Sequence, residues 1–541
     1  MHSVMKRRLA LLALVTTLVV ASTTVYTSKT IDLDAVTVAD LNKAFDAGTL
    51  TAEKLVQLCL ARIQAYDRQG PSLHAIITVN PKAVETARAL DAERKSKGPR
   101  SPLHGVPVVL KDNYDTADMP TTGGSLLLEG SIPPDDAFVV KKLRAAGAII
   151  LAKLNMSEFA SGGAHSSLGG QSLNPHDLTR TPSGSSGGTG VAIAAGYAPI
   201  GMGTDTGGSI RGPSTSNGIV GLKPTLGLLS RDGIIPLALS FDTGGPMARN
   251  VYDVAVALGV MTGVDAADEA TKKSEGKFST DYTTFLKADA LRGARIGVAR
   301  DFLGADGDVD WVVDASIAAM KKAGATIVDV RYPKWLLDAK GEFYNAVRYP
   351  EFVVQIAQYL ATTGPSYPKT LEQMIDRANA MNAVRGDGAG PNPSRWMLFK
   401  REIESGKITD AKYTAVHEHG LALVRGIVDG IFAEQKLDAI VYPTASKRPG
   451  LIADSGGPAT SVGAGPGTAS ATNIANLTGF PDLIVPAGFT GDGLPVGLSF
   501  FGPAFSEPKL LAIGYSFEQA THARRRPVHT PLRPGETITV P

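Results

Sequence analysis

The sequence predicts an α/β protein: a single large domain with a central mixed β-sheet covered by helices on both faces. Short apolar runs alternate with helical patterns along most of the 541 residues, which is typical of strands and crossover helices in a buried sheet. Hydrophobic residues make up 43% of the chain and charged residues 20%, so a large core can form. Length alone suggests about three domains, but a single α/β core can also reach this size.

The expected elements follow this alternation in chain order. Helices are predicted at residues 36–48 and 52–66, the second with Thr51 as its N-cap. Strands are then predicted at 75–79, 106–110 and 148–151, separated by helices at 82–96 and 138–146. Residues 335–435 are predicted to be mostly helical. Further strands are expected at 295–299, 326–330, 439–442, 483–485 and 496–500.

The first residues have the pattern of a secretory signal peptide. Three basic residues (6–8) precede an apolar run over 9–21, and Val19 and Ala21 fit the −3 and −1 positions of a cleavage site. We therefore predict a signal peptide at 1–21, a catalytic chain at 22–541, and export to the periplasm or the extracellular space. The alternative is an uncleaved membrane anchor, although the run is short for a span of about 20 residues.

Charge and cysteine content exclude several classes of partner and site. Lys and Arg number 54 against 52 Asp and Glu, so the net charge of +2 gives no electrostatic case for binding nucleic acid. The single cysteine, Cys59, cannot form an internal disulfide and is expected to pack in a helix. No Cys/His cluster has zinc spacing, and we predict no metal.

The chain has 59 glycines, and the stretch from Ser161 to Gly227 is especially dense in them, with 17. This stretch contains Ser183-Gly-Ser-Ser-Gly-Gly-Thr-Gly190 and Gly203-Thr-Asp-Thr-Gly-Gly-Ser-Ile-Arg211. Neither a phosphate loop nor a dinucleotide-binding glycine pattern occurs, so nucleotide binding is not predicted. Gly184 to Gly188 also matches a serine-hydrolase elbow with Ser186 as nucleophile. That alternative, an esterase, needs a histidine partner, and no histidine has a recognisable local context: His417, His419, His522 and His529.

These motifs, together with Gly105-Val-Pro-Val-Val-Leu-Lys-Asp112 and Gly221-Leu-Lys-Pro-Thr225, resemble the amidase signature family. The resemblance covers nearly the whole mature chain. It is strongest to secreted bacterial peptide amidases, through Ser230-Arg-Asp-Gly-Ile-Ile-Pro236 and the stretch from Phe501 to Pro508. The helical part at 335–435 matches the family least, and we expect it to shape the substrate funnel.

The resemblance implies a catalytic triad and a substrate site. Carried over by position, it makes Ser209 the nucleophile, Ser185 a bridging serine held on a cis peptide bond, and Lys111 the base. The backbone N–H groups of Thr206, Gly207, Gly208 and Ser209 correspond to the oxyanion hole of the family. The carbonyl near Ala160 matches a substrate-contacting position.

The chemistry of these residue types fits the assignment. A lysine acts as a base only when it is neutral, and its ordinary pKa is about 10.4. Burial lowers that pKa, and the apolar run 106–110 leads Lys111 toward the core. Asp205 and Arg211 flank the nucleophile, and we expect them to support its loop.

The predicted function is hydrolysis of carboxylic amide C–N bonds to an acid and ammonia or an amine, through an acyl-enzyme. Peptide C-terminal amides are one substrate class; aryl, fatty-acyl and urethane-type substrates are alternatives. A further alternative is a non-hydrolytic component of an amidotransferase complex. No cofactor is predicted, and the protein is expected to be a monomer or a homodimer, with membrane contact only if the N-terminal segment is uncleaved.

Overall fold

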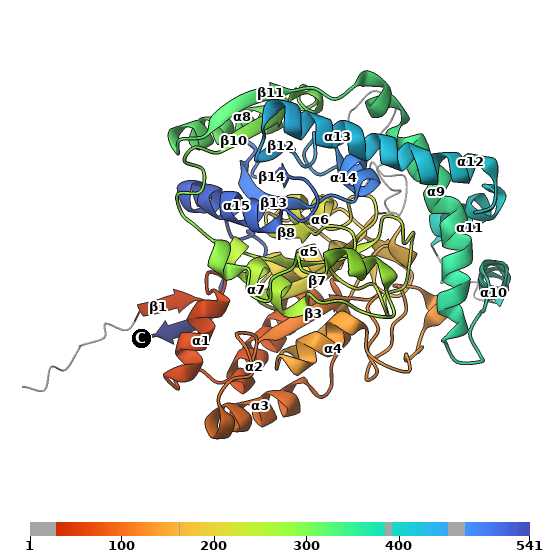
Figure 1. Cartoon of the computed structure of the whole chain (residues 1–541). Helices are drawn as coiled ribbons and strands as arrows, with labels where there is room; N and C mark the ends of the chain where they lie inside the picture. Colours follow the sequence, from red (N-terminus) through yellow and green to blue (C-terminus); the bar gives the residue numbers. More distant parts are fainter. Residues whose placement is uncertain (1–28, 162, 385–391, 453–470) are drawn as a thin grey trace, which may run out of the picture.

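The computed structural model describes residues 29–161, 163–384, 392–452 and 471–541. One mixed sheet of 11 strands forms its centre and is flanked by helices (Figure 1), as the sequence predicts. From edge to edge the strands are β11 (Thr326–Val330), β10 (Arg295–Ala299), β12 (Ala439–Pro443), β14 (Pro495–Phe501), β13 (Asp482–Phe489), β8 (Val220–Lys223), β9 (Thr243–Ala248), β7 (Ile200–Asp205), β3 (Pro107–Lys111), β4 (Ile149–Leu154) and β2 (Ile76–Val79).

Parallel pairing in the middle of this sheet positions the site. β3 runs parallel to β7, with Val108 opposite Ile200 and Leu110 opposite Met202. Because parallel strands end at the same edge of a sheet, the ends of β3 and β7 meet there. Every residue of β3, β7, β8 and β9 is buried, so side chains at these strand ends lie inside the protein.

The helices follow the predicted alternation, and short elements complete the fold. β1 (Lys29–Asp32) pairs with β15 (Thr537–Val540), which joins the two ends of the described chain, and β5 (His165–Ser166) pairs with β6 (Gly170–Gln171). The α-helices are α1 (Val38–Asp46), α2 (Ala52–Ile63), α3 (Ala83–Lys97), α4 (Phe138–Ala145), α5 (Gly187–Ala194), α6 (Arg211–Ser216), α7 (Val251–Met261), α8 (Gly307–Lys322), α9 (Lys334–Ala361), α10 (Leu371–Val384), α11 (Pro393–Glu404), α12 (Ala411–Thr414), α13 (Leu421–Gln435), α14 (Thr472–Thr478) and α15 (Glu507–Thr521).

The predicted helical part at 335–435 is confirmed as α9 to α13. Figure 1 shows α9, α10, α11 and α12 gathered at one side of the molecule, away from α1, α2 and α3. Side chains of α9 hold a loop that precedes β9. Gln355 accepts the N–H of Leu239 at 2.8 Å, and Glu351 accepts the N–H of Ser240 at 3.1 Å. The helical part therefore braces a segment of the site described below.

Three central strands, β7, β8 and β9, were not predicted, because glycine interrupts their apolar pattern. The packing explains these glycines. A Cβ atom at Gly201 would lie 2.7 Å from a methyl group of Thr189, and one at Gly245 would lie 2.1 Å from the carbonyl oxygen of Leu222. Glycine in a strand commonly marks such a close approach.

The predicted signal peptide at 1–21 lies outside the described residues, so its boundary stays a prediction. Among the residues that the structure does describe, no helix is long and apolar enough to cross a membrane. Cys59 is buried in α2, as predicted, and burial raises the pKa of its thiol to about 12.

Candidate active site

Lys111 ends β3 and lies at the centre of the candidate site. Its side chain is fully buried, and Nζ donates hydrogen bonds to Ser185 Oγ and to Thr204 Oγ1, both at 2.7 Å. Burial lowers the pKa of Lys111 to about 7, although the nearby carboxylates of Asp205 and Asp242 act to raise it. A large fraction of this lysine is therefore neutral near pH 7 and able to accept a proton.

Ser185 follows a cis peptide bond between Gly184 and Ser185, as the resemblance implies. Its neighbour Ser186 links this segment to the nucleophile loop, since the N–H of Ser186 donates to the carbonyl of Ser209 at 3.3 Å. The Ser186 hydroxyl is buried and donates to the carbonyl of Thr204 at 3.2 Å. Within the described residues Ser186 contacts no histidine, so the geometry does not support the esterase alternative.

Ser209 lies between β7 and α6 in the loop that carries the predicted oxyanion hole. In the part of the chain that the structure describes, the N–H groups of Thr206, Gly207 and Ser209 donate to no protein acceptor. Gly208 differs from the prediction, because its N–H donates to Asp205 Oδ1 at 2.8 Å. Gly208 has φ +126°, a conformation that glycine adopts readily. Three N–H groups therefore remain for an oxyanion.

The structure brings Lys111 and Ser185 into direct contact but connects Ser209 to them less directly. Among the described residues, the Ser209 hydroxyl makes no side-chain hydrogen bond, and the Ser186 N–H gives the backbone link. Ser209 is partly exposed, whereas Lys111 and Ser185 are buried. A substrate can thus reach the hydroxyl of Ser209 while the base stays covered.

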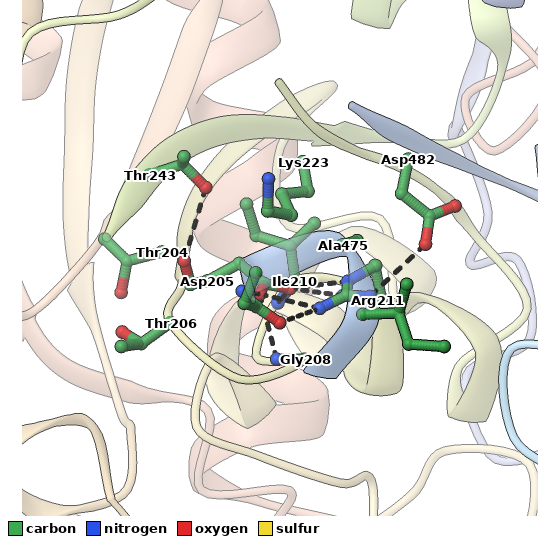
Figure 2. A network of polar contacts seen from close by, with 12 residues as sticks. Thr204, Asp205, Thr206, Gly208, Ile210, Arg211, Lys223, Thr243, Ala475 and Asp482 are labelled. Carbon is green, nitrogen blue, oxygen red and sulfur yellow. Dashed lines mark hydrogen bonds and ion pairs between the residues drawn. The ribbon is translucent and has the colours of Figure 1, made fainter. Parts of the chain in front are cut away.

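A buried ion-pair network supports this loop, as Figure 2 shows. Asp205 accepts hydrogen bonds from the Arg211 guanidinium at 3.1 Å and from the N–H of Ile210 at 3.0 Å, and Arg211 also pairs with Asp482 at 3.3 Å. Burial alone would raise the pKa of Asp205, but the charge and hydrogen bonds of Arg211 hold it well below its usual range. The predicted supporting role of Asp205 and Arg211 matches this geometry.

A small pocket lies next to this loop, and Thr204 and Thr206 form part of its lining. Of the residues predicted to contact substrate, Ala160 and Thr206 line it, whereas Gly207 and Gly208 do not. Sequence reasoning missed the rest of the lining, which is mostly apolar with a few polar groups: Asn113, Thr204, Arg231, Ile234, Ile235, Leu237, Leu239, Asp242, Thr243 and Gly244.

Asp242 fixes one wall of the pocket. It accepts hydrogen bonds from the hydroxyl of Thr206 and from the N–H groups of Leu237, at 2.8 Å, and Ala238, at 3.0 Å. Burial raises its pKa to about 6. Arg231, also in the lining, pairs bidentately with Asp268. Both charged groups are thus occupied by protein partners.

Among the residues that the structure describes, no three His, Cys, Asp or Glu side chains gather as a metal site would.

Comparison with known proteins decides the family. The Amidase family model matches residues 54–511. The chain belongs to the amidase signature family. Among curated relatives of this amidase, a component of the glutamyl-tRNA(Gln) amidotransferase of Symbiobacterium thermophilum is 37% identical over 500 residues, covering 91% of this chain and 98% of that protein. The corresponding component of the same enzyme in Chloroflexus aggregans is 36% identical over 507 residues, covering 91% of this chain and 98% of that one.

Solved structures of peptide amidases are similar to this amidase over almost their full length. Native peptide amidase from Stenotrophomonas maltophilia is 38% identical and superimposes with a TM-score of 0.83, covering 92% of this chain and 99% of that one. An amidase family protein from Bacillus anthracis is 33% identical with a TM-score of 0.79, over 91% of this chain and 92% of that one. The protein is an amide-hydrolysing enzyme with the fold of this family.

Proposed function

We propose that this amidase is an exported enzyme that hydrolyses primary carboxamides, with peptide C-terminal amides as its substrate class, through Ser209, Ser185 and Lys111. One observation carries the catalytic assignment. Lys111 is fully buried, its pKa is lowered to about 7, and its Nζ lies 2.7 Å from Ser185 Oγ. A lysine so placed suits proton transfer near neutral pH and is unusual as a purely structural residue.

The roles proposed for these residues give a two-step reaction. Ser209 Oγ attacks the amide carbonyl while its proton passes through Ser185 to neutral Lys111, and the N–H groups of Thr206, Gly207 and Ser209 stabilise the oxyanion. Lys111 then returns this proton through Ser185 to the leaving nitrogen. The C–N bond breaks, ammonia departs, and an acyl-enzyme on Ser209 remains. Water, deprotonated by the same relay, hydrolyses the ester to the acid and frees Ser209.

The pocket favours an uncharged group beside the scissile amide. Its wall is largely apolar (Ile234, Ile235, Leu237), and its two charged residues, Arg231 and Asp242, already have protein partners. Burying an additional unpaired charge there would be costly. The similarity to solved peptide amidases supports peptide C-terminal amides as the substrate class. Aryl, fatty-acyl and urethane-type substrates are the alternatives.

Export is part of the proposal and rests on the basic residues at 6–8 and the apolar run at 9–21. Mass spectrometry of the protein isolated from the exported fraction is expected to give an N-terminus at Ser22. An intact N-terminus on a chain that stays with the cytoplasmic fraction would refute export and leave the catalytic assignment untouched.

A product assay on the purified chain tests the activity. Ammonia release is expected from peptide amides more than from amino acid amides, anilides or long-chain acyl amides, with no added partner. Lys111→Ala and Ser209→Ala are each expected to lose at least about a thousandfold in kcat/KM. Ser186→Ala serves as the control, because the esterase alternative requires that hydroxyl and the proposed mechanism does not. Failure on every amide in the panel, with activity restored only by a partner protein, would favour the amidotransferase alternative.

A further inference from the structure

Asn113 lies two residues beyond the base and has a side chain that the mechanism above does not use. It is buried, lines the pocket, and donates from Nδ2 to Thr204 Oγ1 at 3.0 Å. Its Oδ1 is buried and has no hydrogen-bond partner among the described residues. Of the residues that line the pocket, Asn113 is the one described residue with such an unpartnered buried side-chain atom. Buried acceptors are rarely left without a donor, so this oxygen points to a ligand group.

The hydrogen bonds of Thr204 take up the NH₂ group of Asn113. Thr204 Oγ1 lies 2.7 Å from Lys111 Nζ and 3.0 Å from Asn113 Nδ2, and both nitrogens donate to it. A hydroxyl oxygen has two acceptor positions, so these two donors fill them. The NH₂ group of Asn113 is thereby held on Thr204, and the amide oxygen is left as the free end.

The same contacts link Asn113 to the residues that must reach the leaving nitrogen. Lys111 and Ser185 must reach the leaving nitrogen to protonate it, and Asn113 is connected to Lys111 through the single hydroxyl of Thr204. A primary carboxamide carries two N–H donors on its nitrogen, whereas the corresponding oxygen of an ester carries none.

We propose that Asn113 Oδ1 accepts a hydrogen bond from an N–H of the scissile carboxamide, and that this contact makes the enzyme select amides over esters of the same acyl group. The inference rests on the proposed function and names the residue that recognises its leaving group. A site built around a polar group on the substrate rejects an analogue that lacks it, because the protein partner is then left unsatisfied.

The test compares one peptide amide with the methyl ester of the same peptide, at pH 8, in the wild-type enzyme and in Asn113→Ala. The expected result is a loss of about 10- to 100-fold in kcat/KM for the amide and of less than about threefold for the ester. Asn113→Asp keeps an acceptor oxygen at the same place and is expected to retain more of the amide preference than Asn113→Ala. If Asn113→Ala does not fold, the amide and ester activities of Asn113→Asp can still be compared with those of the wild type.

Asn217 provides a matched control, because it too is buried with an unpartnered Oδ1 but lies outside the pocket. Asn217→Ala is expected to change thermal stability and leave the amide-to-ester ratio of kcat/KM as in the wild type. Equal losses on amide and ester in Asn113→Ala would overturn the inference and assign Asn113 to positioning Thr204 and Lys111. A wild-type enzyme inactive on both substrates would instead refute the proposed function.

Discussion

The pKa of Lys111 makes a direct prediction about how activity depends on pH. Burial lowers that pKa from 10.5 to about 7. About half of the lysine is then neutral at pH 7, whereas an exposed lysine would be neutral in only about 0.03% of molecules. Burial thus raises the population of the active base by roughly a thousandfold at neutral pH. For a substrate that does not titrate, kcat/KM is expected to rise about tenfold per pH unit below 7 and to level off above it.

The assay is ammonia release from a neutral peptide amide between pH 5 and 9. Lys111→Arg is the informative variant, because a guanidinium stays protonated throughout this range and is expected to be inactive at every pH. Two carboxylates near Lys111, Asp205 and Asp242, raise its pKa and so set the position of the midpoint. A flat profile in the wild type, or a midpoint near 10, would refute the assignment of Lys111 as the base.

The same shift predicts a stability effect with a definite sign. Between about pH 7 and 10.5 the unfolded chain keeps Lys111 protonated while the folded chain does not, so the unfolded state binds more protons and stability rises with pH. Below pH 7 both states are protonated, and the buried charge costs about 5 kcal/mol relative to exposed lysine. Lys111→Met is therefore expected to be more stable than the wild type at pH 6, by an amount that shrinks toward pH 10. Calorimetry at both pH values measures this, and a constant difference would contradict it.

Two further predictions concern the nucleophile loop. A Cβ at Gly207 would lie 2.9 Å from the Tyr344 hydroxyl, so Gly207→Ala is expected to reduce kcat/KM by about tenfold or more. The double variant with Tyr344→Phe is expected to recover part of that loss, and no recovery would exclude this clash as the cause. Arg211→Met leaves two buried aspartates unpaired and is expected to lower the free energy of unfolding by about 3–5 kcal/mol in denaturant titration. The surface pair of Arg88 with Glu53 is the control, because Arg88→Ala is expected to leave the free energy of unfolding nearly unchanged. A loss equal to that of Arg211→Met would contradict the importance of the buried network.

Much of the fold follows from local patterns. The strands at 295–299 and 326–330 and the helices near 52 and 138 are found where periodicity and capping residues predict them. β7, β8 and β9 were missed, since Gly201, Gly221 and Gly245 interrupt their patterns for reasons that lie in neighbouring elements. The pairing of β1 with β15 was missed as well, because a contact between the two ends of a chain has no local signal.

For the site, the sequence by itself determined the candidates: its ordered motifs assign the proposed catalytic roles to Lys111, Ser185 and Ser209 by resemblance, and the resemblance anticipated the cis peptide bond before Ser185. Only the tertiary structure decided how they are used. It gives the Gly208 N–H to Asp205 and leaves Asn113 Oδ1 buried without a hydrogen-bond partner among the described residues. The reason is physical: motifs record residue types and spacing, whereas hydrogen-bond partners and burial depend on elements far apart in the chain that folding brings together.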